Sequence, residues 1–184
     1  MTSAEHASLR ALIRTIPDYP KPGILFRDVT TLLADAEGFR QSVAALAAPY
    51  VAPGTGHIDR VAAIEARGFI LGGALADRIG AGFVPVRKRG KLPHATVGVD
   101  YTLEYGVDRL EVHADAVHPG DRILVVDDLI ATGGTALAAV ELIEGLGGVV
   151  VGVAAIVDLP DLGGSGRLRA LGHTVHALCA FEGD

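Results

Sequence analysis

The stretch from Val125 to Thr135 places two carboxylates beside a loop of small residues. Its sequence is Val-Val-Asp-Asp-Leu-Ile-Ala-Thr-Gly-Gly-Thr, and an alanine-rich helical pattern follows it. In residues 131–135, small side chains leave backbone N–H groups unhindered at the positive end of the expected helix, where proteins bind phosphate. Asp127 and Asp128 stand just before this loop and could bind sugar hydroxyls or a magnesium ion. The stretch therefore indicates a phosphorylated sugar as the ligand, and the alternative is a tight connection without one.

Two common phosphate-binding motifs are excluded here. No lysine follows the glycines, so the loop is not a Walker loop, and the dinucleotide fingerprint G-x-G-x-x-G is absent.

A second candidate site is the basic run Arg87–Lys91, with the sequence Arg-Lys-Arg-Gly-Lys, in a chain whose net charge is -6. It follows an expected strand and can reach the same crevice as the loop. Arg67, after Glu65 and Ala66 at another strand end, adds a guanidinium group. Two anion sites, with the sugar-binding carboxylates Asp127 and Asp128 between them, match a sugar that carries a phosphate at one end and a pyrophosphate at the other. A solvated basic turn is the alternative for the run.

Alternating strands and helices are expected to bring these residues together. Apolar runs predict strands at 61–65, 83–87, 123–127, 149–157 and 174–181, and helical patterns occupy 68–79, 137–146 and 167–171. This rhythm predicts an α/β fold with a doubly wound, mostly parallel sheet. Such sheets bind ligands at the carboxyl ends of their strands, where the acidic pair, the loop and the basic run all lie.

Two segments fall outside this rhythm. At the N-terminus, a capping box from Thr2 to Glu5 predicts a helix whose apolar face continues to Ile16, a proline-rich loop follows, and Asp35 can cap a second helix. The insertion at 91–115 is long enough for a lid or a disordered linker, and Leu110–His113 within it favours a hairpin strand.

Composition narrows the class of protein. The 184 residues suit one domain with a full-sized core. The negative net charge argues against nonspecific nucleic-acid binding, and the single cysteine, Cys179, excludes an internal disulfide and a thiolate zinc cluster. The N-terminus lacks a signal-peptide pattern, and no run of about 18 apolar residues exists, so we expect no membrane span and a cytoplasmic protein.

Several motifs together resemble a known family. Residues 125–135 resemble the phosphoribosyl pyrophosphate signature of type I phosphoribosyltransferases, and residues 17–28, 65–69, 87–93 and 103–106 resemble the branch of that family that acts on adenine. The resemblance runs from about residue 13 to residue 159. It implies a single phosphoribosyltransferase domain over 1–184, with an N-terminal hood segment at 1–34 and a mobile lid hairpin within 91–115. It also implies a purine-salvage enzyme that transfers the 5-phosphoribosyl group from phosphoribosyl pyrophosphate to adenine, giving AMP and pyrophosphate.

The resemblance implies a role for each group of residues around the sugar donor. The 5′-phosphate would bind to the loop Ala131, Thr132, Gly133, Gly134 and Thr135. The ribose hydroxyls would bind to Asp127 and Asp128, directly or through water on a Mg²⁺ ion that arrives with the donor. The pyrophosphate would bind to the cations Arg67, Arg87, Lys88 and Lys91. In such enzymes the turn matching Glu65–Ala66 often carries a cis peptide bond.

On the base side, the resemblance implies that Phe26 and Leu159 stack on the two faces of the purine. Arg27 and the backbone of Leu25 would read its edge, and Glu104 and Tyr105 would arrive on the lid. Without the resemblance, a packing role would be favoured for Phe26 and a solvated charge for Glu104. The expected catalytic residues are Glu104, Arg67 and Arg87.

Ala131 bears on the choice of base. Related enzymes for 6-oxopurines often have an aspartate at this position, where it is the candidate proton acceptor for purine N7. Alanine cannot accept a proton, so Glu104 is the available carboxylate, and adenine is favoured over hypoxanthine or guanine. The alternatives are a phosphoribosyltransferase for another base and a ligand-sensing regulator of the same fold, which would need neither the basic run nor the lid carboxylate. The family is typically homodimeric.

Overall fold

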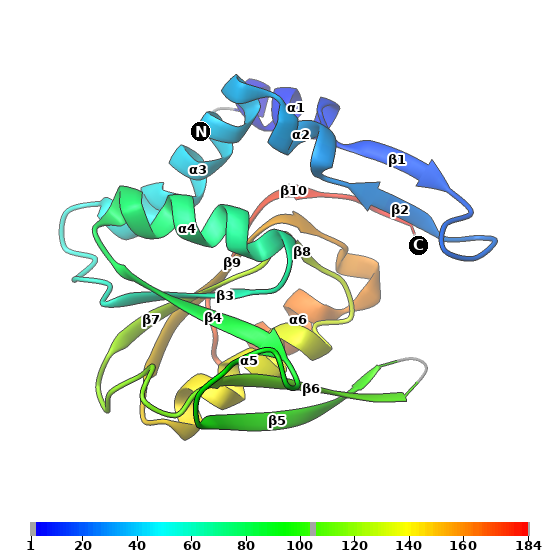
Figure 1. The fold of residues 1–184 in the computed structure, drawn as a ribbon. Coiled ribbons are helices and arrows are strands. Elements are labelled where there is room, and N and C mark those ends of the chain that lie inside the picture. Colours follow the sequence, from blue (N-terminus) through cyan, green and yellow to red (C-terminus); the bar gives the residue numbers. More distant parts are fainter. Residues whose placement is uncertain (1–2, 104–105, 184) are drawn as a thin grey trace.

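The computed structural model describes residues 3–103 and 106–183 of the chain (Figure 1). Its centre is an eight-stranded sheet with the order β10-β9-β7-β3-β4-β6-β5, in which the short strand β8 also pairs with β9. The strands are β3 (Arg60–Ile64), β4 (Gly82–Lys88), β5 (Thr96–Leu103), β6 (Gly106–His113), β7 (Arg122–Val126), β8 (Leu129–Ile130), β9 (Val149–Asp158) and β10 (Val175–Ala180). Strands β10, β9, β7, β3 and β4 run parallel, as the sequence predicted.

Helices cover both faces of the sheet (Figure 1). One face packs against α1 (Ser3–Ala11), α3 (Ala36–Val51) and α4 (Arg67–Ile79), and the other packs against α5 (Gly134–Gly145) and α6 (Gly164–Ala170). Both faces of the sheet need cover because successive side chains of β3 point to opposite faces and those from Val61 to Ile64 are all apolar. Val61 and Ala63 are buried with α4, whereas Ala62 and Ile64 are buried with α5. The fold is therefore the doubly wound α/β architecture that the strand and helix rhythm predicted.

The N-terminal segment differs from the prediction at one point. Helix α1 ends at Ala11, and Ile16 lies instead in strand β1 (Arg14–Pro17), which pairs antiparallel with β2 (Leu25–Asp28). Proline restricts the residue before it to extended conformations, so Ile16 cannot continue a helix into Pro17. The five-residue helix α2 (Thr30–Ala34) follows β2. The expected cap of α3 is confirmed, because the Asp35 carboxylate accepts a hydrogen bond of 2.7 Å from the Gly38 N–H.

The insertion at 91–115 forms an antiparallel hairpin of β5 and β6, which confirms the expected strand at Leu110–His113. Strand β6 also pairs with the end of β4, through Arg87 with Glu111 and Lys88 with Leu110. The hairpin thereby extends the main sheet, and the expectation of a disordered linker is wrong for its described strands. Residues 104–105, at the tip, lie outside the described part of the chain.

No helix in the described ranges is long and apolar enough to cross a membrane.

Candidate active site

Two pockets adjoin at the carboxyl ends of the parallel strands. The first has a volume of about 420 Å³ and lies between the end of β3, the loop after β7 and the β5–β6 hairpin. The second, of about 400 Å³, lies between β2, Leu129 and the segment from Leu159 to Leu162. Both are lined by Arg67, Leu129, Ala131 and Thr132, so the two cavities share a wall. A more polar pocket that adjoins a more apolar one can bind a ligand with one charged part and one apolar part, or two such ligands side by side.

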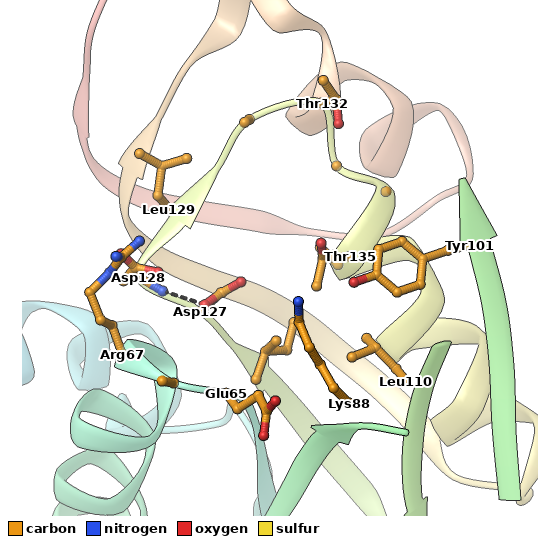
Figure 2. Close-up of a pocket in the computed structure, with 16 residues that line it drawn as sticks. Glu65, Arg67, Lys88, Tyr101, Leu110, Asp127, Asp128, Leu129, Thr132 and Thr135 are labelled. Carbon is orange, nitrogen blue, oxygen red and sulfur yellow. Dashed lines mark hydrogen bonds and ion pairs between the residues drawn. The ribbon is translucent and has the colours of Figure 1, made fainter. Parts of the chain in front are cut away.

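The phosphate loop lines the first pocket (Figure 2). Gly133 has a left-handed backbone with φ 81°, which glycine adopts without a steric penalty, and it forms the N-cap of α5. No side chain of a described residue caps this helix, so its first N–H groups remain available to a ligand, and Gly133 and Gly134 line the pocket. Helix α6 supports the loop from behind, where the Gly164 N–H donates to the Ala131 carbonyl oxygen at 3.1 Å. The loop therefore has the geometry of an anion site.

The acidic pair follows strand β7 and lines the same pocket. The Asp128 N–H donates to the Asp127 carboxylate at 2.9 Å, and the Asp128 carboxylate accepts a bond of 2.5 Å from Nε of Arg67. Burial, followed by the charge of Asp128, raises the pKa of Asp127 well above its usual range. Burial is the largest single cause and lowers the pKa of Arg67, but the bond to Asp128 and the negative charges around it together outweigh burial, so the net shift is upward. The pair can thus accept hydrogen bonds from the hydroxyls of a sugar while Arg67 stays cationic.

The acidic pair also bears on the expected magnesium ion. Among the described residues, no group of three or more His, Cys, Asp or Glu side chains is close enough together to hold a metal ion. Mg²⁺ in proteins often keeps several waters and is bound through one or two carboxylates together with substrate phosphates. Asp127 and Asp128 fit a site of this kind, in which two carboxylates and the substrate's phosphates bind the ion together and the ion arrives with the substrate.

The cations predicted from the sequence fall into two sets. Arg67 and Lys88 line the first pocket, and Lys88 Nζ lies 3.0 Å from the Asp108 carboxylate. Arg87, on the opposite face of β4, donates to Glu65 at 2.8 Å and to the Lys91 carbonyl oxygen at 3.1 Å. Neither Arg87 nor Lys91 lines either of the two pockets. The peptide bond between Glu65 and Ala66 is cis, as the resemblance implied.

Tyr101 and Asp108 belong to the site although sequence reasoning gave them no role. They lie opposite each other in the β5–β6 hairpin, with the Tyr101 hydroxyl 3.4 Å from the Asp108 carboxylate. Figure 2 shows the hydroxyl of Tyr101 directed toward Thr135 of the phosphate loop. Burial, followed by the charge of Asp108, raises the pKa of Tyr101, so it is a neutral hydrogen-bond donor at pH 7. The signal available in the sequence was the strand alternation of residues 96–103, which sends every second side chain to the same face.

The second pocket has the apolar walls that a planar base requires. Phe26 and Leu159 both line it, and Tyr19 packs edge-on against Phe26 at a ring distance of 5.1 Å. Leu25 also lines it, beside Phe26 on β2. Arg27 is only 8% exposed, and its guanidinium donates to Thr15 Oγ1 at 2.6 Å. That side chain is therefore held largely by the protein itself.

Glu104 and Tyr105, the expected lid residues, lie outside the described part of the chain. The strands that lead to them, β5 and β6, carry Tyr101 and Asp108 beside the first pocket.

Comparison with known proteins agrees with this geometry. Residues 30–167 match the family described as the phosphoribosyl transferase domain. The chain is 58% identical over 183 residues to the adenine phosphoribosyltransferase of Methylorubrum extorquens (strain PA1), covering 100% of this chain and 99% of that protein. It is 59% identical over 184 residues to that of Brucella anthropi, with full coverage of both.

Solved structures give the same result. The crystal structure of adenine phosphoribosyltransferase from Rhodothermus marinus superimposes with a TM-score of 0.90 at 48% identity, covering 98% of this chain and 100% of that one. The Saccharomyces cerevisiae enzyme, in complex with an imino-altritol bisphosphate and adenine, gives 0.89 at 34% identity, covering 97% and 100%.

Proposed function

This chain belongs to the adenine phosphoribosyltransferase family, and on that premise we propose that it transfers the 5-phosphoribosyl group from phosphoribosyl pyrophosphate to adenine, giving AMP and pyrophosphate in purine salvage. The observation that supports this most strongly is the shared wall of the two pockets. An anion site with an acidic floor adjoins a largely apolar pocket of base size, so the sugar carbon that reacts would sit where the two meet.

The donor would occupy the first pocket. Its 5′-phosphate would accept hydrogen bonds from the N–H groups of residues 131–135, and its ribose hydroxyls would face Asp127 and Asp128. Arg67 and Lys88 would lie near the pyrophosphate and stabilise the charge that develops as it leaves. A Mg²⁺ ion bound with the donor, held through water by the acidic pair, would supply further neutralisation of that charge.

Arg87 and Lys91 remain predicted pyrophosphate ligands. Arg87 would first have to exchange its bond with Glu65 for one with the substrate, because the described geometry commits its guanidinium to that carboxylate. The exchange conserves a charge-assisted hydrogen bond.

Adenine would occupy the second pocket between Phe26 and Leu159, with the backbone of Leu25 and with Arg27 at its edge. Its N9 would attack the sugar as the bond to pyrophosphate breaks. Glu104, arriving with Tyr105 on a lid, would accept or share the proton at N7. Closure would exclude water that could otherwise hydrolyse the activated sugar.

The wider organisation is proposed on the same basis. Residues 1–34 would form a hood over the base and residues 91–115 the lid, within one domain over 1–184. We expect a cytoplasmic homodimer.

A substrate panel tests this function. The purified protein is incubated with phosphoribosyl pyrophosphate, Mg²⁺ and either adenine, hypoxanthine or guanine, and nucleotide formation is measured. We expect AMP formation to exceed turnover of both 6-oxopurines. Greater turnover with a 6-oxopurine would contradict the base assignment, and binding of the donor without turnover of any base would favour a regulator.

A further inference from the structure

The segment that follows β10 lies beside the base pocket, in contact with residues that line it. Residues 181–183 run between strand β2 on one side and the short helix η1 (Pro160–Leu162) on the other. Leu25 and Arg27 of β2 line that pocket, and so do Leu159 and Leu162 at the two ends of η1. The segment is thus placed between the two walls that a bound base would touch.

On the β2 side, the segment is attached through Arg27. The Arg27 guanidinium donates to the Glu182 carbonyl oxygen at 3.2 Å and lies 4.7 Å from the centre of the Phe181 ring. Arg10 of α1 lies 4.5 Å from the same ring. The segment also approaches Leu25, because a Cβ on Gly183 would lie 3.9 Å from Leu25 Cδ1.

On the other side, two hydrogen bonds attach the segment, one to the end of β9 and one to η1. The Phe181 N–H donates to the Asp158 carbonyl oxygen at 3.0 Å. The Gly183 N–H donates to the Asp161 carboxylate at 2.8 Å. Asp161 is exposed and lines neither pocket, so the bond to Gly183 is its contribution to this region.

We propose that residues 181–183 are a clasp that sets the width of the base pocket, and that Asp161 is a positioning residue for adenine binding. The proposal rests on the proposed function, since it assigns the second pocket to adenine. The clasp joins two walls that come from distant parts of the sequence, Arg27 of β2 on one side and η1 (Pro160–Leu162) on the other. Stacking on both faces of a planar base requires a fixed separation of the walls, and releasing one end of the clasp lets that separation vary.

Asp161→Ala tests the proposal by removing the carboxylate that holds Gly183. The KM for adenine should rise about three- to tenfold, the range expected for loss of one hydrogen bond. The KM for phosphoribosyl pyrophosphate and kcat at saturating adenine should stay within about twofold of wild type, a separation that general destabilisation would not produce. Asp161→Asn keeps an oxygen that can accept the Gly183 N–H, and it should restore the KM for adenine.

Asp35→Ala is the matched control. It also removes one carboxylate bond to a backbone N–H, of 2.7 Å, but at the cap of α3 and away from both pockets. It should lower the thermal midpoint and leave both KM values unchanged.

Three outcomes would overturn the clasp: an unchanged KM for adenine in Asp161→Ala, an equal rise in both KM values, or no recovery in Asp161→Asn. Wild-type turnover of adenine is measured first, and its absence would overturn the proposed function together with the clasp. Normal wild-type turnover with an unaltered KM in Asp161→Ala would overturn the clasp alone.

Discussion

Substitution of Gly164 by alanine would test whether packing against α6 positions the phosphate loop. A Cβ on Gly164 would lie 2.3 Å from the carbonyl oxygen of Ala131, 2.5 Å from the nitrogen of Gly133 and 2.8 Å from the carbonyl carbon of Thr132. All three are backbone atoms of the loop that would bind the 5′-phosphate. Gly164 is the first residue of α6, where alanine has no intrinsic penalty, so the effect of the substitution is steric.

The size of the effect follows from those distances. Ordinary van der Waals contact of a Cβ begins at 3.4 Å, so the loop must move by roughly 1 Å to admit the methyl group. A displacement of about 1 Å at a positioning element can lower catalysis on the order of 10²-fold, which corresponds to about 2.7 kcal/mol in kcat/KM. Overpacking of this kind also lowers the free energy of unfolding by about 1–3 kcal/mol.

The assay is steady-state kinetics with phosphoribosyl pyrophosphate varied at saturating adenine, together with a thermal denaturation curve. The control is Gly166→Ala in the same helix, where an added Cβ would have no heavy atom within 4 Å. The control should keep wild-type kcat/KM, whereas Gly164→Ala should lose about two orders of magnitude. A Gly164→Ala protein with kcat/KM within twofold of wild type would refute the inference that α6 sets the position of the loop.

Three further predictions concern single side chains. Glu104→Gln should lower kcat by about 10²–10⁴-fold while leaving the affinity for phosphoribosyl pyrophosphate nearly intact, and unchanged kcat in steady-state assays would remove Glu104 from the acid–base role. Tyr101→Phe should raise the KM for phosphoribosyl pyrophosphate about three- to tenfold without changing that for adenine, since it deletes the hydroxyl directed at Thr135; equal kinetics would show that this hydroxyl makes no contact with the donor. The pKa of Asp127 is raised, so the folded protein binds the proton of this carboxyl group more tightly than the unfolded chain does. The contribution of that proton to the free energy of unfolding is therefore lost as the pH rises from about 4 toward the raised pKa. Asp127→Asn should not show this loss when the free energy of unfolding is measured by urea denaturation from acid to neutral pH. Parallel plots of that free energy against pH for the wild type and the variant would contradict the raised pKa.

The arrangement of the sheet and the phosphate loop could be predicted from the sequence because both depend on local chemistry. The apolar run at 61–65 predicted a buried strand, and β3 is indeed buried on both faces, one in each core cluster. Gly133 occupies a position whose positive φ favours glycine, and Asp35 caps α3 through the residue three positions later. Each of these signals acts within a few residues of the chain.

The prediction that the apolar face of the first helix continues to Ile16 was wrong for a local reason. Pro17 keeps Ile16 extended, so the apolar spacing that suggested a longer first helix instead belongs partly to β1. The basic run was predicted to form one anion site, and that role remains a prediction, but the structure sends its side chains in different directions. Strand β4 sends Lys88 toward the first pocket and Arg87 toward Glu65, and that division depends on where β3 places Glu65.

Local sequence patterns were enough to predict the alternating strands and helices of the sheet, the loop that would hold a phosphate, the acidic pair and the family. Only the tertiary structure decided that Tyr101 faces Thr135, that Gly164 supports the loop from behind, and that Gly183 is bonded to Asp161 beside the base pocket. These contacts join residues far apart along the chain, so neither periodicity nor capping chemistry encodes them. They exist because the sheet and its helices bring separate loops to one edge and pack them at van der Waals distance.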